Sequence, residues 1–241
     1  MNTGASAWLT DERARLYLDG VRGAIPGAAL QLSVLGRIAQ SWCHSPATIL
    51  DLGCGDGILG LALRQLFPSA TSVFVDFSEP MLAAVRARTI DLAGSRVVLA
   101  DLSAPSWTDA VRAFSPFDIV VSGFAIHHQP NARKHALFAE IHELLAPRGV
   151  FLNLDQVASS SSAVERVFDD FFIDHLREFH HRVGSEATLD ATVNAYFSAK
   201  GENLLTPLDD QCQWLRDTGY ADVDCFCKVF DLALFGGRKA E

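Results

Sequence analysis

From about residue 48, short apolar runs alternate with stretches in which apolar residues recur at helical spacing. The runs are too short for ordinary helices, and glycine, proline, serine or aspartate bounds each of them. They are TILDL (Thr48–Leu52), SVFVD (Ser72–Asp76), RVVLAD (Arg96–Asp101), FDIVVSG (Phe117–Gly123) and GVFLNLD (Gly149–Asp155). This alternation is typical of a parallel sheet with helices on both faces. We therefore predict five central strands in a doubly wound α/β fold, with a core over residues 46–155.

Three further segments lie outside this alternation. Residues 1–45 predict an N-terminal helical cap, and residues 156–205 predict a helical insertion after the fifth strand. We expect these two segments to cover the carboxyl edge of the sheet as a lid. Residues 206–241 predict a last helix that ends at Gly219, because glycine often terminates helices, and then a β-hairpin that turns near Phe230 and Asp231.

Composition narrows the class of protein. A chain of 241 residues with 49% hydrophobic residues has the size for one core. Its formal net charge of -9 disfavours a nucleic-acid partner, because such binding relies on lysine and arginine at phosphates. The five cysteines form no CxxC pair, which fits a reducing compartment. Since the sequence shows neither a signal peptide nor an apolar run of membrane-spanning length, we expect a cytoplasmic protein without a membrane partner.

The stretch ILDLGCGDGILG joins the first predicted strand to a helix through a glycine-rich turn. Gly53, Gly55 and Gly57 allow sharp turning and close approach of a ligand, while the helix start offers free N–H donors. Asp76, at the end of the second strand, is placed to accept from ribose hydroxyls. Since the spacing of Gly55, Gly57 and Gly60 also satisfies the dinucleotide fingerprint GxGxxG, these residues alone leave a nicotinamide cofactor open.

Four motifs in order carry a resemblance over nearly the whole chain. ILDLGCGDG, VFVDFSEPML, VVLADL and FDIVVSGFAIHH resemble the first four motifs of the class I, Rossmann-like S-adenosylmethionine-dependent methyltransferases. RDTGYADVDCFCKVFDLALFGGRK is similar to that family's last helix and terminal hairpin. The resemblance implies a mostly parallel seven-stranded sheet with an antiparallel last strand, and S-adenosyl-L-methionine as cofactor.

The resemblance also implies roles for particular residues. Glycines of the turn would cradle the methionine part of the cofactor, a second-strand carboxylate would bind the ribose, and residues after the second and third strands would surround the adenine. Gly53, Gly55 and Gly57 would form the cradle, with Asp51 supporting the loop, and Asp76 would bind the ribose. Phe77 and Met81, together with Asp101 and the Leu102 amide, would surround the adenine, and Ser122 from the fourth motif would be a further contact. Met81 also suits a plain core position, and Asp101 also suits a turn.

Upstream, YLDGVRGAIPG resembles the lead-in of a subgroup that includes carboxy-S-adenosylmethionine synthase. This makes Tyr17 a candidate contact for the carboxylate of the cofactor. The alternative for Tyr17 is a packed aromatic ring with its hydroxyl at the surface.

His127 and His128 follow the fourth predicted strand, where the methyl acceptor would meet the cofactor. Histidine titrates near neutrality, so either is a candidate general base, and the alternative is that the pair only orders the loop. A second pair, His180 and His181, has no third ligand at metal spacing, so we predict no metal site.

We therefore expect methyl transfer by in-line displacement to an oxygen, nitrogen or carbon nucleophile of a small molecule. An enzyme that remodels the cofactor, as the synthase relatives do, and a nicotinamide-dependent oxidoreductase are the alternatives.

The insertion places Phe168, Phe171, Phe172 and Phe179 largely on one helix face. That face is expected to be buried against the sheet, in a pocket or against a partner chain, which leaves room for a homodimer.

Overall fold

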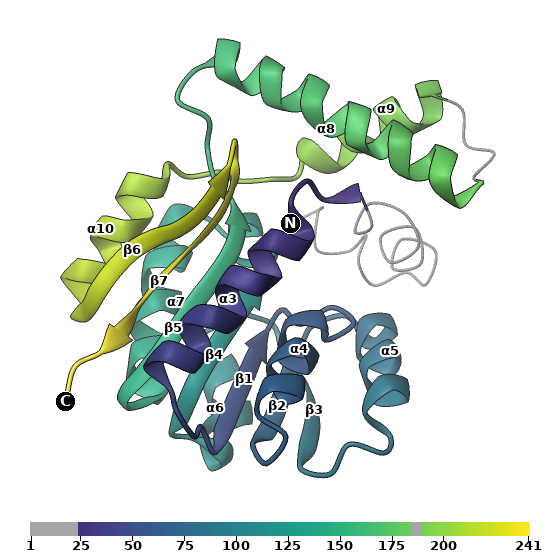
Figure 1. Cartoon of the computed structure of the whole chain (residues 1–241). Coiled ribbons are helices and arrows are strands. Elements are labelled where there is room, and N and C mark those ends of the chain that lie inside the picture. The colour runs from purple at the N-terminus through teal and green to yellow at the C-terminus, as the bar shows by residue number, and fades with distance from the viewer. Residues whose placement is uncertain (1–23, 185–188) are drawn as a thin grey trace.

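The computed structural model describes residues 24–184 and 189–241. The described residues form one seven-stranded sheet in the order β3-β2-β1-β4-β5-β7-β6 (Figure 1). Its strands are β1 (Thr48–Leu52), β2 (Thr71–Asp76), β3 (Ser95–Leu99), β4 (Phe117–Gly123), β5 (Leu145–Gln156), β6 (Tyr220–Val229) and β7 (Leu232–Lys239). Strands β1 to β5 are parallel, and β7 lies antiparallel between β5 and β6. The predicted α/β fold with an antiparallel last strand is confirmed.

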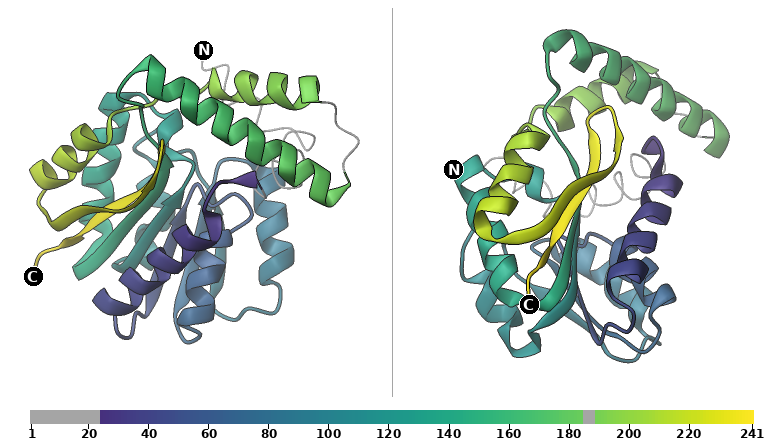
Figure 2. Two further views of the ribbon diagram at one scale, coloured as in Figure 1. Left: turned by 45° about the horizontal axis from the view of Figure 1, so that its top comes forward. Right: turned by 60° about the vertical axis from the view of Figure 1, so that its left-hand side comes forward.

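Helices cover both faces of the sheet because the strands are apolar on both faces. The helices α3 (Ala28–Trp42), α4 (Ile58–Leu66) and α5 (Glu79–Thr89) lie on one face, and α6 (Trp107–Val111), α7 (Asn131–Leu144) and α10 (Leu208–Thr218) on the other (Figure 2). Along β1, Ile49 packs in a cluster with Leu35 and Leu63, whereas Leu50 belongs to the cluster of the opposite face. Both faces of the central strand β1 are therefore buried.

The local signals for helix ends are confirmed. Ser78 caps α5, because its side chain accepts a hydrogen bond from the Met81 amide at 3.5 Å, and Pro80 occupies the first turn. Gly219 ends α10 with φ of 104°, a left-handed conformation that favours glycine. These ends fix where the loops at the carboxyl edge of the sheet begin.

The segment between β5 and α10 forms two helices, α8 (Ser162–Val183) and α9 (Leu189–Lys200). Figure 1 shows them crossing above the sheet, beside the tip of the β6–β7 hairpin. Phe168 and Phe172 on α8 are buried and cluster with Leu232 of the hairpin. Phe171 contacts Phe230 at 5.2 Å between ring centroids. The predicted aromatic face is thus buried, and we call the pair α8 and α9 the roof.

The two chain connections to the roof are bonded to each other. The Ala158 amide donates to the Thr206 carbonyl at 3.0 Å, and the Asn203 amide group donates to Gln156 Oε1 at 2.9 Å. Lys134 of α7 is fully buried beneath them and donates to Thr206 Oγ1 at 2.7 Å and to the Leu204 carbonyl. We call these hydrogen bonds the polar base of the roof. They join the roof to the sheet at several points.

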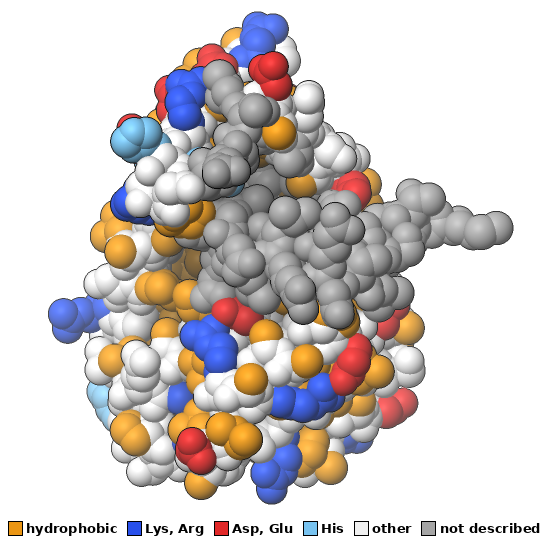
Figure 3. Space-filling view, turned by 90° about the vertical axis from the view of Figure 1, so that its right-hand side faces the viewer, with side chains coloured by type: hydrophobic (Ala, Val, Ile, Leu, Met, Phe, Trp, Pro, Cys, Tyr) orange, Lys and Arg blue, Asp and Glu red, His pale blue; other side chains and the backbone are white. Residues whose placement is uncertain are grey.

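In the part of the chain that the structure describes, no helix is long and apolar enough to cross a membrane. On the face shown in Figure 3, basic side chains lie beside acidic ones in the lower part of the molecule. Arg86 pairs with Glu79 at 2.5 Å, and Arg88 pairs with Asp56.

Candidate functional site

A cleft opens at the carboxyl ends of β1, β2, β4 and β5, between the sheet and the start of α3. The space, together with its open mouth, has a volume of about 960 Å³. Its described lining is apolar on the α3 side and acidic near the strand ends. The lining residues are Ile25, Ala28, Gln31, Leu32, Asp51, Gly53, Cys54, Gly55, Asp56, Ile58, Leu59, Asp76, Ser78, Met81, Gly123, Phe124, Ala125, His128 and Leu154.

The glycine turn forms the bottom of this cleft. Gly53 has φ of 59°, and a Cβ atom there would lie 2.2 Å from the Cβ of Ala125, so a larger residue would force the loop apart. Gly55 has φ of 54°, and a Cβ there would meet nothing within 4 Å. Because Gly55 lines the cleft, that space is where a ligand could approach the backbone. Gly57, with φ of 80°, starts α4 and does not line the cleft in the described residues.

Asp51 lies at the end of β1 and is 1% exposed. Its Oδ2 accepts a hydrogen bond from the Gly60 amide at 2.8 Å, which ties the strand to the first turn of α4. A buried carboxylate held in this way fixes the course of the turn between them. Asp51 also lines the cleft, so it combines a structural contact with a position beside the ligand space.

Asp76, at the end of β2, faces the cleft across the turn. Its Oδ2 accepts from the Gly55 amide at 2.9 Å and its Oδ1 accepts from the Ser78 amide at 2.8 Å. Burial raises the pKa of this carboxyl above its usual 3.8, and the amide donors Ser78, Gly55 and Phe77 partly oppose that rise. Each oxygen keeps capacity for a second donor, as a vicinal diol would supply.

Of the predicted adenine contacts, the structure brings only Met81 to the cleft lining. Phe77 is half-buried, and Leu102 is buried. Asp101 is exposed and accepts from the Ser103 amide at 2.8 Å and its hydroxyl at 2.7 Å, which is the turn that its residue type allows. Ser122 is 0% exposed and donates to the Leu52 carbonyl at 2.9 Å, inside the sheet. Tyr17 lies outside the described residues.

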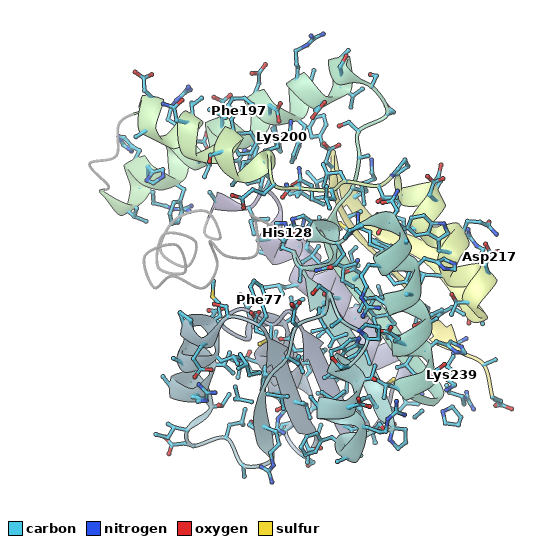
Figure 4. The ribbon with its side chains drawn as sticks, turned by 180° about the vertical axis from the view of Figure 1, so that it is seen from behind. Phe77, His128, Phe197, Lys200, Asp217 and Lys239 are labelled. Carbon is cyan, nitrogen blue, oxygen red and sulfur yellow. The ribbon has the colours of Figure 1, made fainter. Side chains whose placement is uncertain are left out.

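The two neighbouring histidines occupy different environments. Both lie on the short 3-10 turn η3 (Ile126–His128) that follows β4. His127 is 6% exposed, and its Nδ1 lies 2.5 Å from Asp155 Oδ1, while its amide donates to Asp155 Oδ2 at 2.9 Å. His128 lines the cleft, and Figure 4 shows it between the roof and the sheet, with Phe77 nearer the sheet. The structure therefore brings one histidine of the pair to the ligand space.

Sequence reasoning missed Gln31, Ile25 and Phe124, which also line the cleft. Phe124 has φ of 52°, a left-handed conformation that is strained for a bulky residue, by roughly 1–3 kcal/mol. It packs against the cleft and also against the aromatic cluster beneath the roof. A positive φ leaves no signal in a sequence unless glycine or asparagine occupies the position.

Comparison with known proteins agrees with this geometry. Residues 50–151 match a family model described as a methyltransferase domain. The carboxy-S-adenosyl-L-methionine synthase of Geobacter metallireducens is 27% identical over 238 residues, 95% of this chain and 91% of the relative. The enzyme of the same name from Shewanella amazonensis is 25% identical over 227 residues, 91% and 87% of the two chains.

A solved structure of an O-methyltransferase family protein from Burkholderia thailandensis superposes with a TM-score of 0.69 at 17% identity. The match covers 100% of this chain and 64% of that one, so the chain spans about two thirds of that protein. It has the same fold. Together, the matched methyltransferase domain, the synthase relatives and the shared fold support a class I S-adenosylmethionine-dependent methyltransferase.

The residues at the cleft of this methyltransferase fit its cofactor. Gly55 leaves open space at the backbone, and the buried Asp76 offers acceptors at the position where a ribose would lie. The carboxylates of Asp51, Asp56 and Asp76 line the cleft, where they would attract a positively charged sulfonium. Opposite charge and close backbone approach are what such a ligand requires.

Proposed function

We propose that this methyltransferase transfers the methyl group of S-adenosylmethionine to an oxygen, nitrogen or carbon nucleophile of a small molecule held between the cleft and the roof. The observation that carries the proposal is that the cleft and the aromatic cluster beneath the roof share residues. Phe124 and Ile25 line the cleft and also pack in the cluster with Phe168 and Phe172 of α8. A molecule between them would lie against apolar walls with its reactive atom toward the strand ends.

S-adenosylmethionine supplies a methyl group on a sulfonium, which is a strong electrophile without further activation. The chain's task is then to align the nucleophile and exclude water, and alignment alone can supply roughly 7 to 11 kcal/mol of barrier reduction. The roof serves this task because its buried aromatic face closes the upper side of the apolar region. Its polar base, with Lys134 bonded to Thr206, holds the roof over the strand ends.

His128 is the candidate to receive a proton from a hydroxyl or amine nucleophile, at a ring nitrogen. Its ring lies 4.0 Å from that of His127, centroid to centroid, and Asp155 holds His127 in place. We assign His127 a positioning role, since its buried ring is occupied by that carboxylate, and His128 the contact with substrate. A hydrogen-bonded carboxylate behind a histidine fixes ring orientation and tautomer.

A second candidate function rests on the relatives. The two curated proteins are named carboxy-S-adenosyl-L-methionine synthases, so an activity that remodels the cofactor follows from similarity. Against it, the carboxylates of Asp51 and Asp76 line the cleft and disfavour a ligand that carries a further carboxylate. We therefore favour transfer of the methyl group over remodelling of the cofactor.

The decisive experiment is titration calorimetry of the cofactor-stripped protein with S-adenosylmethionine, S-adenosylhomocysteine and NADH. Saturable binding of the first two supports the proposal, and binding of NADH alone would reject it. Mass spectrometry of small molecules that remain bound through purification separates the two remaining activities. Demethylated cofactor supports methyl transfer, whereas a carboxylated cofactor supports the synthase-like activity.

We place the protein in the cytoplasm, without a nucleic-acid partner, because its free cysteines suit a reducing compartment and its net charge of -9 repels phosphates. Val167, Val183 and Phe197 are exposed on the roof helices. A homodimer would bury exposed apolar side chains such as these, and sedimentation velocity over a range of protein concentrations tests it.

A further inference from the structure

Gln31 is a polar residue on the buried stripe of α3. The buried residues of this helix are Gln31, Leu35, Gly36 and Ala39, which recur at helical spacing toward the sheet. Gln31 is 1% exposed and lines the cleft. A buried amide in a place that suits an apolar side chain destabilises the fold unless its hydrogen bonds are made.

Only half of that amide is satisfied. The Gln31 Nε2 group donates to the Pro26 carbonyl at 3.3 Å, which sets the orientation of the side chain. Its Oε1 atom is buried and has no hydrogen-bond partner among the residues that the structure describes. Since the side chain lines the cleft, the missing partner is a donor on the molecule that the cleft binds.

The sheet order identifies which end of the ligand reaches Gln31. Asp76 lies on β2, and β1 separates β2 from β4 and β5, the side of the sheet on which α3 packs. S-adenosylmethionine is a linear molecule of adenine, ribose, sulfonium and amino acid. With the ribose at Asp76, one end extends toward α5 and the other across β1 toward α3.

The chemistry of the two sides distinguishes those ends. On the α5 side Met81 lines the cleft with an apolar thioether, which suits a flat adenine ring. On the α3 side the cleft is lined by the amide of Gln31 and by apolar residues, among them Ile25, Leu32 and Leu154. An ammonium group there has N–H donors for a neutral oxygen, and Asp51 lies nearby on β1 to oppose its charge.

We propose that Gln31 is a cofactor-binding residue whose Oε1 accepts a hydrogen bond from the α-ammonium group of S-adenosylmethionine. This inference rests on the proposed function, because it takes the cleft as the site of that cofactor. It assigns to α3 the recognition of the amino-acid end, while β2 recognises the ribose.

The test compares two probes on the full-length protein. S-adenosylhomocysteine carries the amino-acid part, and 5′-methylthioadenosine lacks it. Gln31→Leu removes the acceptor at similar volume and should weaken S-adenosylhomocysteine binding about tenfold or more, the value of a hydrogen bond to a charged group. Binding of 5′-methylthioadenosine should stay within about twofold by the same reasoning. Gln31→Glu, which keeps an acceptor, should restore binding of S-adenosylhomocysteine.

Gln211→Leu is the matched control, since Gln211 is also buried on a helix but lies on α10 and bonds to the Thr206 carbonyl. It should change neither affinity. Unchanged binding of S-adenosylhomocysteine to Gln31→Leu, or equal weakening of both probes, would overturn the inference alone. If the wild-type protein bound neither probe, the proposed function itself would fail. Should Gln31→Leu not fold, Gln31→Met gives the same comparison at the length of the native side chain.

Discussion

The floor of the cleft and the roof above the sheet are built by different means. The floor consists of strand ends and the glycine turn, where backbone amides bond to buried carboxylates such as Asp51 and Asp76. The roof consists of α8 and α9, which reach the rest of the molecule through aromatic rings, among them Phe168 and Phe171, and a polar base. Directional bonds fix a position closely, whereas aromatic packing tolerates small shifts.

From this difference we infer that the floor binds the cofactor and the roof binds the methyl acceptor. A floor of fixed amides and carboxylates suits a cofactor that is the same in every turnover. A roof of aromatic rings suits an acceptor whose shape the rings can match by packing. The division is testable, since a change in one half should leave the function of the other half intact.

The largest expected effect is at His128, which lines the cleft and lies between the roof and the sheet (Figure 4). His128→Gln should lower kcat by about 10²–10⁴-fold if the histidine takes a proton in the transition state. Affinity for S-adenosylhomocysteine should not change, because His128 is assigned to the acceptor. Formation of S-adenosylhomocysteine with an acceptor found by screening measures kcat. His135→Gln, an exposed histidine on α7, is the control, and an unaltered kcat in His128→Gln would leave the pair with an ordering role only.

The roof should unfold separately from the floor. Phe168→Ala removes a ring that is 0% exposed, a change that costs about 3–5 kcal/mol of local stability in a packed core. Hydrogen exchange should therefore accelerate in α8 and α9 while β1 and β4 stay protected. Phe151→Ala, in the core of the sheet, should instead accelerate exchange throughout. Equal loss of protection everywhere in Phe168→Ala would show that the two halves form one cooperative unit.

In the floor, Asp76→Ala should weaken S-adenosylhomocysteine binding roughly 100-fold, since it removes a charged acceptor for two hydroxyl groups. It also removes the partner of the Gly55 amide. Calorimetry measures the loss, with Asp91→Ala as control, because Asp91 is an exposed carboxylate just after α5. Affinity within about twofold of wild type would contradict the assignment of the ribose to Asp76.

The smallest effect is a pH dependence of the same carboxylate. Burial raises the pKa of Asp76 above 3.8, and the ionised form accepts hydrogen bonds from the ribose hydroxyls more strongly than the protonated form does. Affinity for S-adenosylhomocysteine should therefore fall as pH drops through that raised pKa, by up to about tenfold per pH unit, and level off above it. Asp76→Asn should show a lower affinity without this step. An identical step in Asp76→Asn would assign the dependence to another group.

The floor was largely predictable because its signals are local. β1 begins and ends where predicted, and Asp76 closes β2, since apolar runs bounded by glycine and aspartate define short buried strands. The prediction for β5 began at Gly149, but the strand starts at Leu145. Arg148 adopts φ of 66°, as in a turn, and the pairing of β5 with β4 is irregular near Phe117. The residues just before Gly149 therefore have turn-like geometry although they belong to the strand.

The roof and the cleft lining were predictable only in outline. Aromatic spacing shows that α8 buries one face, but not that Phe171 meets Phe230 of the hairpin, which is a contact between distant segments. Likewise no local pattern separates His127 from His128, because Asp155 on β5 decides which ring is held. Gln31 did leave a signal, since it continues the stripe of Leu35 and Ala39, and a polar residue on such a stripe indicates a buried partner.

The position of β7 between β5 and β6 has a consequence for how the chain reaches this structure. The register pairs Gln156 with Leu232, so the loop that this pairing closes contains the whole roof and α10. Closing a loop of that length opposes folding through chain entropy, and contacts so distant in sequence form slowly. Until β7 arrives, β5 presents an unpaired apolar edge on which other chains can add, so aggregation during refolding should begin at this strand.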